Sequence, residues 1–342
     1  MNLDRPARHT SAQRSDAFDP TIRLDLAHNP YGPCPAAIEA VEACLESSLE
    51  SLATTFRRRL SEVYRMPVGS IHLFECVDCA IGALAGRHLG PIIAFPPAAT
   101  ANLVAESCRR SDIVSITRGA CGDAVVGAEF AADIPANGLA IIDSPSNPLG
   151  SIVSPADMMR LSRACTCVVI DERFAEFSEF SLLPLARELD NVIVMRSFAP
   201  WAGLPESCCS WAVAPPKLAE GFERAMTAVQ PEAIVGAMAT LENQASVSAT
   251  LKLVREERSR LYRFLRRLSF LQPLPSWGPF ITGRVTVVSR QNLVDGLAKR
   301  GIRIHAPEEP GLEEYVRIGI GSRTAMDRLR SALLELGPEL IA

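Results

Sequence analysis

The chain has 342 residues, 48% hydrophobic and 22% charged, with a formal net charge of −4. This length allows one large domain and a smaller one, and the slight negative charge gives no reason to expect nucleic acid or an anionic membrane as partner. No apolar run approaches the roughly eighteen residues of a membrane span, and the polar N-terminus lacks the apolar stretch of a secretory signal. We therefore expect a cytoplasmic protein with reduced cysteines and a flexible N-terminal arm over residues 1–22.

The next part of the chain, residues 23–250, is expected to be the large domain. Helical patterns are predicted over residues 35–49 and 54–64. Short apolar runs then recur, and each is predicted to be a buried strand: Ile92–Phe95, Ile113–Thr117, Leu139–Asp143, Cys167–Asp171, Val192–Met195 and Trp211–Ala214. Helix-like segments such as residues 155–164 separate most of these runs. Alternation of this kind predicts the α/β class, with a mainly parallel sheet covered by helices on both faces.

The end of the chain, residues 251–342, is expected to be a smaller α+β domain. A long helix is predicted to begin at Pro231 and to run through Arg255 to Leu271, with its arginines on a solvated face. After it come a predicted strand at residues 281–288, a helix at 292–300, strands at 302–304 and 315–320, and a final helix.

Four motifs resemble those of histidinol-phosphate aminotransferases, which bind pyridoxal phosphate (PLP). They are Leu24–Pro33 (Leu-Asp-Leu-Ala-His-Asn-Pro-Tyr-Gly-Pro), Ser146–Gly150 (Ser-Asn-Pro-Leu-Gly), Val168–Phe174 (Val-Val-Ile-Asp-Glu-Arg-Phe) and Val316–Gly321 (Val-Arg-Ile-Gly-Ile-Gly). They occur in the order of that family and at about its spacing. The resemblance implies a fold-type-I aminotransferase fold and a dimer.

The resemblance also implies roles for individual residues. Asp171 matches the carboxylate that holds the pyridinium nitrogen of the cofactor, and Asn147 matches the partner of its phenolic oxygen. Phe174 stands where the family has a tyrosine, and Arg317 matches the arginine that binds the substrate carboxylate. A structural role stays open for three of them, because Asp171 could cap a strand, Asn147 could serve its turn and Arg317 could be a surface residue. The resemblance also places Asn29 and Tyr31 of the first motif at the ligand pocket.

Other family positions have changed. A gapless alignment places Pro200 at the position of the lysine that forms the Schiff base, and Ala199 at that of a phosphate-binding serine. Cys208 stands where a phosphate-binding arginine is expected. Cys76 and Val77 replace the Gly-Ser pair whose backbone holds the phosphate. The stacking aromatic residue falls near Ala98 or Ala99, and His305 replaces a further arginine.

Only three lysines could replace the missing one. Lys217 follows two prolines at a helix start, Lys252 lies on the long predicted helix, and Lys299 precedes a strand of the small domain. None is expected to face the pocket. We therefore expect no PLP in the usual covalent mode, although PLP is the cofactor of the family.

Ten cysteines are present, and the resemblance places Cys76 and Cys208 beside each other in the former phosphate site. With Cys79, and with His72 nearby, they could form a soft-metal or redox site. The alternative is that small buried cysteines fill the space left by a lost ligand, and this reading predicts no metal.

Three functions remain open at this point. The first is an inactive relative of the aminotransferases that binds a small amino acid or phosphate ester, as a homodimer or paired with an active homologue. The second is an enzyme with chemistry that needs no PLP, which uses Asp171, Arg317 or the cysteines. The third is an active aminotransferase, if the alignment at Pro200 is wrong.

Overall fold

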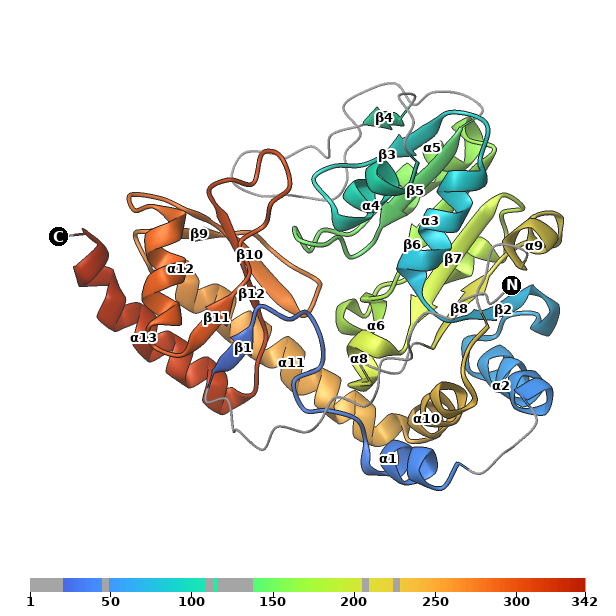
Figure 1. Cartoon of the computed structure of the whole chain (residues 1–342), viewed down its shortest axis with the longest axis horizontal. Helices are drawn as coiled ribbons and strands as arrows, with labels where there is room; N and C mark the ends of the chain where they lie inside the picture. Colours follow the sequence, from blue (N-terminus) through green and yellow to red (C-terminus); the bar gives the residue numbers. More distant parts are fainter. Residues whose placement is uncertain are drawn as a thin grey trace, which may run out of the picture.

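The computed structural model describes residues 21–44, 49–108, 113–115, 138–204, 209–223 and 228–341. Figure 1 shows a large sheet with helices on both faces and, beside it, a smaller group of strands and helices near the C-terminus. Residues 1–20 of the predicted arm lie outside the described residues. Within the described part, no helix combines the length and apolar character needed to cross a bilayer.

Seven strands form the central sheet, in the order β2–β8–β7–β6–β5–β3–β4. Their bounds are β2 Ile71–Phe74, β3 Ile92–Ala94, β4 Ile113–Ser115, β5 Leu139–Asp143, β6 Cys167–Asp171, β7 Val192–Ser197 and β8 Ser210–Val213. The strands from β3 to β7 run parallel, whereas β8 is antiparallel to both β7 and β2. The predicted α/β class and mainly parallel sheet are confirmed.

Helices cover both faces of this sheet. They are α1 Pro35–Glu42, α2 Leu49–Tyr64, α3 Val77–Arg87, α4 Ala99–Cys108, α5 Pro155–Ala164, α9 Pro216–Glu223 and α10 Pro231–Glu242, with short helices α6 Ala175–Ser178, α7 Leu183–Ala186 and α8 Ala199–Ala202. Successive strand residues face opposite sides: Ile141 packs in the core that includes α3 and α4, and Ile142 in the core that includes α2 and α5. Burial on both faces explains why these strands read as continuous apolar runs.

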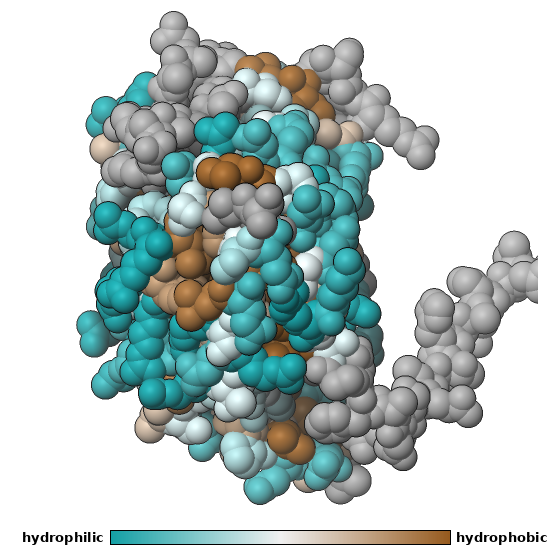
Figure 2. All heavy atoms as spheres, turned by 90° about the vertical axis from the view of Figure 1, so that its left-hand side faces the viewer, coloured by the Kyte–Doolittle hydropathy of each residue, from teal (hydrophilic) through white to brown (hydrophobic). Residues whose placement is uncertain are grey.

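The smaller group contains a sheet in the order β12–β10–β9 and a parallel pair of β1 with β11. Its elements are β1 Ile22–Leu24, α11 Gln244–Leu265, β9 Leu271–Pro273, β10 Phe280–Val285, α12 Arg290–Ala298, β11 Ile302–Ile304, β12 Tyr315–Gly319 and α13 Arg323–Ile341. The surface of this end of the molecule is mainly hydrophilic, with small apolar patches (Figure 2). Ile22, the last residue of the predicted arm, pairs with Ile302, so the first described strand joins this C-terminal group.

The long helix predicted from Pro231 to Leu271 is wrong. Two helices occupy most of this stretch, and they meet at Asn243, whose backbone is not helical (φ −103°, ψ 40°). The Asn243 side-chain amide donates to the Ala239 carbonyl at 2.8 Å, which satisfies a carbonyl at the end of α10. Leu271 lies in β9, where it pairs with Val285.

Three further boundaries differ from the prediction. The strand predicted over residues 281–288 ends at Val285, and Val287 has a φ of 69°, which a β-branched residue adopts only in a turn. The helix predicted over residues 35–49 ends at Glu42, where the Cys44 amide donates to the Val41 carbonyl and tightens the last turn. Strand β2 was not predicted, because a run of four residues gives a weak pattern.

Candidate functional site

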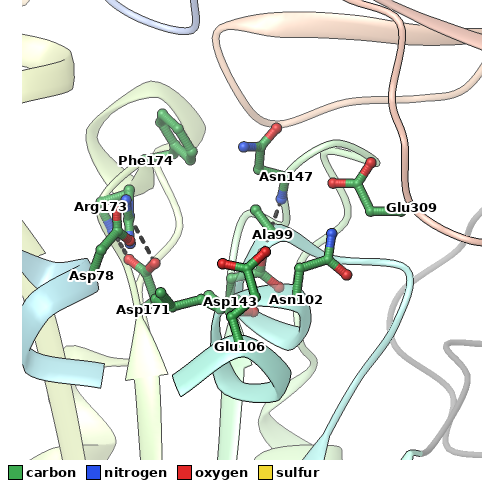
Figure 3. Close-up of a pocket in the computed structure, with 12 residues that line it drawn as sticks. Asp78, Ala99, Asn102, Glu106, Asp143, Asn147, Asp171, Arg173, Phe174 and Glu309 are labelled. Carbon is green, nitrogen blue, oxygen red and sulfur yellow. Dashed lines mark hydrogen bonds and ion pairs between the residues drawn. The ribbon is translucent and has the colours of Figure 1, made fainter. Parts of the chain in front are cut away.

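A cavity of about 290 Å³ lies at the carboxyl ends of β5 and β6. Its walls carry mainly polar and acidic side chains (Figure 3). The lining residues are Asp78, Ala99, Thr100, Asn102, Leu103, Glu106, Asp143, Asn147, Asp171, Arg173, Phe174 and Glu309. Asp143 and Asp171 are the last residues of β5 and β6, and this edge is where open α/β sheets bind ligands.

Arg173 links two carboxylates in one wall of this cavity. Its Nε donates to Asp171 Oδ2 at 2.7 Å, and its backbone N–H donates to Asp171 Oδ1 at 3.0 Å. Its Nη2 forms an ion pair with Asp78 in the first turn of α3 (Figure 3). Burial alone would lower the pKa of Arg173, but the carboxylates of Asp171 and Asp78 raise it above its ordinary value. Arg173 is therefore a fixed positive charge on Asp171, a carboxylate that is only 2% exposed.

Asn147 connects the end of the central seven-stranded sheet to Arg317 on β12. Its backbone N–H donates to Asp143 Oδ2 at 3.0 Å, and its side-chain Oδ1 accepts from Arg317 Nη1 at 2.5 Å. Asp143, Asn147 and Arg317 thus form a chain that joins the end of β5 to the small sheet.

The Arg317 guanidinium is buried and has no hydrogen-bonded carboxylate among the described residues. Its Nη2 donates to the Asp25 carbonyl at 2.6 Å, its Nε has no hydrogen-bond partner in the described part of the chain, and its Cζ lies 5.3 Å from the centre of the Phe280 ring. Burial lowers the pKa of Arg317 to about 10, which still leaves it charged at neutral pH. His305 exchanges backbone hydrogen bonds with Arg317, and burial followed by the charge of Arg317 lowers the pKa of its imidazole.

The aromatic residue at the cavity is Phe174. Its ring packs edge-on against Phe280 with centroids 5.8 Å apart and lies 6.5 Å from Phe177. A phenylalanine carries no hydroxyl, so this wall of the cavity is apolar. Ala98 is buried and Ala99 lines the cavity, so no aromatic ring stands at either position.

Asn29 and Tyr31, which were predicted at the pocket, do not line it. The Asn29 side-chain amide donates to the Trp201 carbonyl at 3.1 Å, and its backbone N–H donates to the Pro200 carbonyl at 2.7 Å. Gly203, with a φ of 71°, ends α8 so close to Gly32 that a Cβ there would lie 2.3 Å from the Gly32 carbonyl carbon. These contacts hold the N-terminal segment against α8 and the Pro200 backbone.

Of the residues that the resemblance places at phosphate positions, Cys76 and Val77 lie at the start of α3 and Ala199 lies at the start of α8. Cys76 caps α3, where its Sγ accepts from the Cys79 backbone N–H at 3.4 Å, and Val77 is buried in the core. The Ala199 backbone N–H donates to Ser197 Oγ at 3.3 Å. Cys208 lies outside the described residues, which leaves the three-cysteine hypothesis a prediction. Among the residues that the structure describes, no group of three or more His, Cys, Asp or Glu side chains could hold a metal ion.

The three lysines lie away from the cavity. Lys217 on α9 forms an exposed ion pair with Asp190, with 2.7 Å between Nζ and Oδ2. Lys252 lies in α11, beside a separate groove lined by other charged residues of that helix. Lys299 follows the last residue of α12 in the C-terminal group of elements. None of them is among the residues that line the cavity.

Residues 128–333, more than half of the chain, match the family model of class I and II aminotransferases. The chain belongs to this aminotransferase family. The histidinol-phosphate aminotransferase of Dehalococcoides mccartyi (strain ATCC BAA-2266 / KCTC 15142 / 195) is 27% identical to this aminotransferase-family chain over 323 residues, covering 92% of the chain and 90% of that enzyme.

Solved aminotransferase structures have the same fold. A putative histidinol-phosphate aminotransferase from Erwinia carotovora atroseptica SCRI1043 superposes with a TM-score of 0.82 at 19% identity, over 94% of this chain and 97% of its own. The histidinol-phosphate aminotransferase from Sinorhizobium meliloti, solved in complex with pyridoxal-5'-phosphate, gives 0.79 at 21% identity, over 93% and 91%. The predicted fold-type-I aminotransferase fold is confirmed.

Sequence reasoning missed four charged residues of the cavity in this aminotransferase-family chain, namely Asp78, Glu106, Arg173 and Glu309. Arg173 had a signal, because it stands in the Val168–Phe174 motif where the family motif has alanine. Glu309 had none, since it lies in the connection between β11 and β12, far in sequence from the strand ends that it faces.

Proposed function

We propose that this chain is a histidinol-phosphate-aminotransferase-like protein that binds a small amino acid without covalent PLP chemistry. One observation carries the proposal: none of the three lysines lines the cavity at Asp171, whereas the motif alignment puts Pro200 at the lysine position. Schiff-base chemistry needs an amine within reach of the reacting carbonyl. No lysine of this chain meets that condition at the cavity.

The charged residues around the cavity also do not fit PLP. Asp171, the match to the pyridinium partner, already accepts two hydrogen bonds from Arg173 of the same chain. At the α3 end, where a phosphate would need hydrogen-bond donors, Asp78 contributes a carboxylate and Cys76 caps the helix. A phosphate there would face a negative charge in place of the usual anion site.

The substrate-carboxylate end of the site supports ligand binding. A buried guanidinium without a hydrogen-bonded carboxylate is costly, and a ligand carboxylate would supply that hydrogen-bonded partner. Asn147 and the Asp25 carbonyl fix the plane of the Arg317 guanidinium before a ligand arrives. We infer that Arg317 binds the α-carboxylate of the ligand, with Phe174 and Phe280 as the apolar side of the site.

Two measurements test this proposal. The purified protein is mixed with PLP, reduced with borohydride and digested, and mass spectrometry locates any pyridoxyl group. We expect no modified lysine; stoichiometric trapping on Lys217, Lys252 or Lys299 would show that the chain retains Schiff-base chemistry and that the proposal is wrong. Thermal shifts with a panel of amino acids should then show binding that Arg317→Ala abolishes, whereas Arg284→Ala, which removes an exposed arginine of β10, should leave it unchanged.

A further inference from the structure

Two cysteines meet in the first turn of α3. Cys76 precedes the helix with an extended backbone (φ −143°, ψ 133°), and its Sγ accepts from the Cys79 backbone N–H at 3.4 Å. Side chains three residues apart in a helical turn are neighbours, and here the two thiol groups are also hydrogen-bonded to each other. The two sulfur atoms are therefore adjacent, as a disulfide requires.

This pair is accessible to molecules in solution. Cys79 is exposed and Cys76 is half-buried. Cysteines that only fill space in a core are buried, so the space-filling alternative does not account for Cys79. The described residues also include no group of three or more His, Cys, Asp or Glu side chains that could hold a metal ion. Oxidation is the chemistry that remains for two accessible thiols in contact.

The two cysteines have different positions in the pair. Cys76 Sγ accepts from both the backbone N–H and the thiol of Cys79, and it lies at the N-terminal end of α3. The hydrogen bond to Cys76 is the largest cause that raises the pKa of the Cys79 thiol to about 11, so Cys79 keeps its proton at neutral pH. Because a thiolate attacks a disulfide and a thiol does not, Cys76 is the attacking residue and Cys79 the one that completes the reaction.

From these contacts we infer that Cys76 and Cys79 form a reversible dithiol–disulfide site that reacts with low-molecular-weight disulfides such as oxidised glutathione. The Cys76 thiolate attacks one sulfur of the reagent, which forms a mixed disulfide and releases one glutathione thiolate that takes up a proton. The Cys79 sulfur then attacks Cys76 Sγ and passes its proton to the second glutathione as it leaves. The chain loses two electrons and two protons, and the two released glutathione molecules gain them.

The pair flanks a residue of the cavity wall. Asp78, between the two cysteines in the sequence, lines the cavity and forms an ion pair with Arg173 (Figure 3). A disulfide would enclose Asp78 in a covalent ring at the start of α3. The inference does not depend on the proposed function, because the exchange reaction needs no amino acid in the cavity.

The experiment maps the thiols of the full chain in glutathione buffers. The protein is equilibrated at rising ratios of oxidised to reduced glutathione, alkylated in denaturant with N-ethylmaleimide and digested with trypsin. Residues 66–87 form one tryptic peptide with Cys76 and Cys79 as its only cysteines, whereas Cys208 belongs to the peptide of residues 197–217. We expect peptide 66–87 to change from doubly alkylated to unalkylated, with two hydrogens fewer than the reduced peptide, and dithiothreitol to reverse this change.

The same digest contains an internal control. Cys165 and Cys167 lie together in the tryptic peptide of residues 164–173. Burial raises the pKa of their thiols to about 11 and about 12 respectively, so this second pair should remain reduced and become alkylated in denaturant. The variant Cys79→Ser should stop the reaction at Cys76 carrying one glutathione, with circular dichroism to confirm that the variant is folded.

Three results would overturn the inference. Peptide 66–87 could stay doubly alkylated at about a tenfold excess of oxidised glutathione, which would show that the pair does not exchange. It could become linked to peptide 197–217, which would show that Cys208 is the partner. Finally, Cys76 could stay without glutathione in Cys79→Ser, which would show that it is not the attacking residue.

Discussion

At the scale of single residues, Arg173 changes what the cavity can hold. It stands two positions after Asp171, and its guanidinium reaches both that carboxylate and Asp78 on α3. The pyridinium nitrogen of PLP would bring a positive charge to Asp171, but Arg173 of the same chain already supplies one. Under the proposed function, Arg173 changes the electrostatics at the cofactor ring, whereas Pro200 stands at the position of its covalent anchor.

We predict that Arg173→Ala lowers the free energy of unfolding by about 2–4 kcal/mol, because it leaves the buried Asp171 carboxylate without its charged partner. Adding Asp171→Asn should recover at least about 1 kcal/mol, since the double variant has no unpaired charge at that position. Urea unfolding of the single and double variants measures both effects. Arg187→Ala, at an exposed position, serves as control and should change stability by less than about 0.5 kcal/mol. A double variant that is no more stable than Arg173→Ala would contradict the assigned pairing.

At the scale of elements, a second buried ion network ties β6 to β7. Glu172 accepts from Arg196 Nε at 3.0 Å and from the Leu182 amide at 2.5 Å, and Arg196 Nη1 lies 2.5 Å from Glu176 Oε1. Burial raises the pKa of Glu172, although Arg196 acts in the opposite direction. Asp171 and Glu172, which are neighbours in the sequence, thus have different roles. Asp171 lines the cavity, whereas Glu172 joins strands β6 and β7 to α6 and α7.

We predict that Glu172→Ala destabilises the fold by about 3–5 kcal/mol, because the buried Arg196 would keep only Glu176 of its two carboxylate partners. Glu314→Ala, which breaks an exposed ion pair with Arg284, should cost less than about 1 kcal/mol. Chemical denaturation followed by circular dichroism compares the two variants. Similar losses in both would show that the Glu172 network does not stabilise the fold.

The elements also show which parts of the fold could be predicted from the sequence. Runs such as Leu139–Asp143 and Cys167–Asp171 were predictable, because strands buried on both faces are apolar throughout. The break at Asn243 was not, because a polar residue within a helical pattern does not reveal where its amide will bond. The motifs brought Asn147, Asp171 and Phe174 to the cavity, but the position of Glu309 at the same cavity depends on tertiary contacts that no local pattern records.

At the scale of the whole molecule, two histidines make stability depend on pH. Burial is the main cause that lowers the pKa of both His28 and His305 below 6.5, with Arg23 and Arg317 respectively adding to it. A histidine with a lowered pKa in the folded state binds its proton first in the unfolded state. His28 lies in the N-terminal segment that follows β1, and His305 directly follows β11, the strand that pairs with β1.

We therefore predict that the free energy of unfolding falls as the pH decreases below about 6.5, the ordinary histidine pKa. The double variant His28→Asn, His305→Asn should show a flatter dependence between pH 7 and pH 5.5. Thermal unfolding at a series of pH values measures the slope. A slope that is equally steep in the double variant would assign the dependence to other groups.

The pairing of β1 with β11 has a consequence for how the chain reaches its final form. Ile22 is translated long before its partner Ile302, so β1 has no strand to join until the central sheet and most of the C-terminal group have been synthesised. The segment that follows β1 carries Asn29, which bonds to the Pro200 backbone. Residues 22 and 302 must therefore both be made before this segment is held at its two ends, and a nascent chain released before β11 is made would leave β1 without its partner strand.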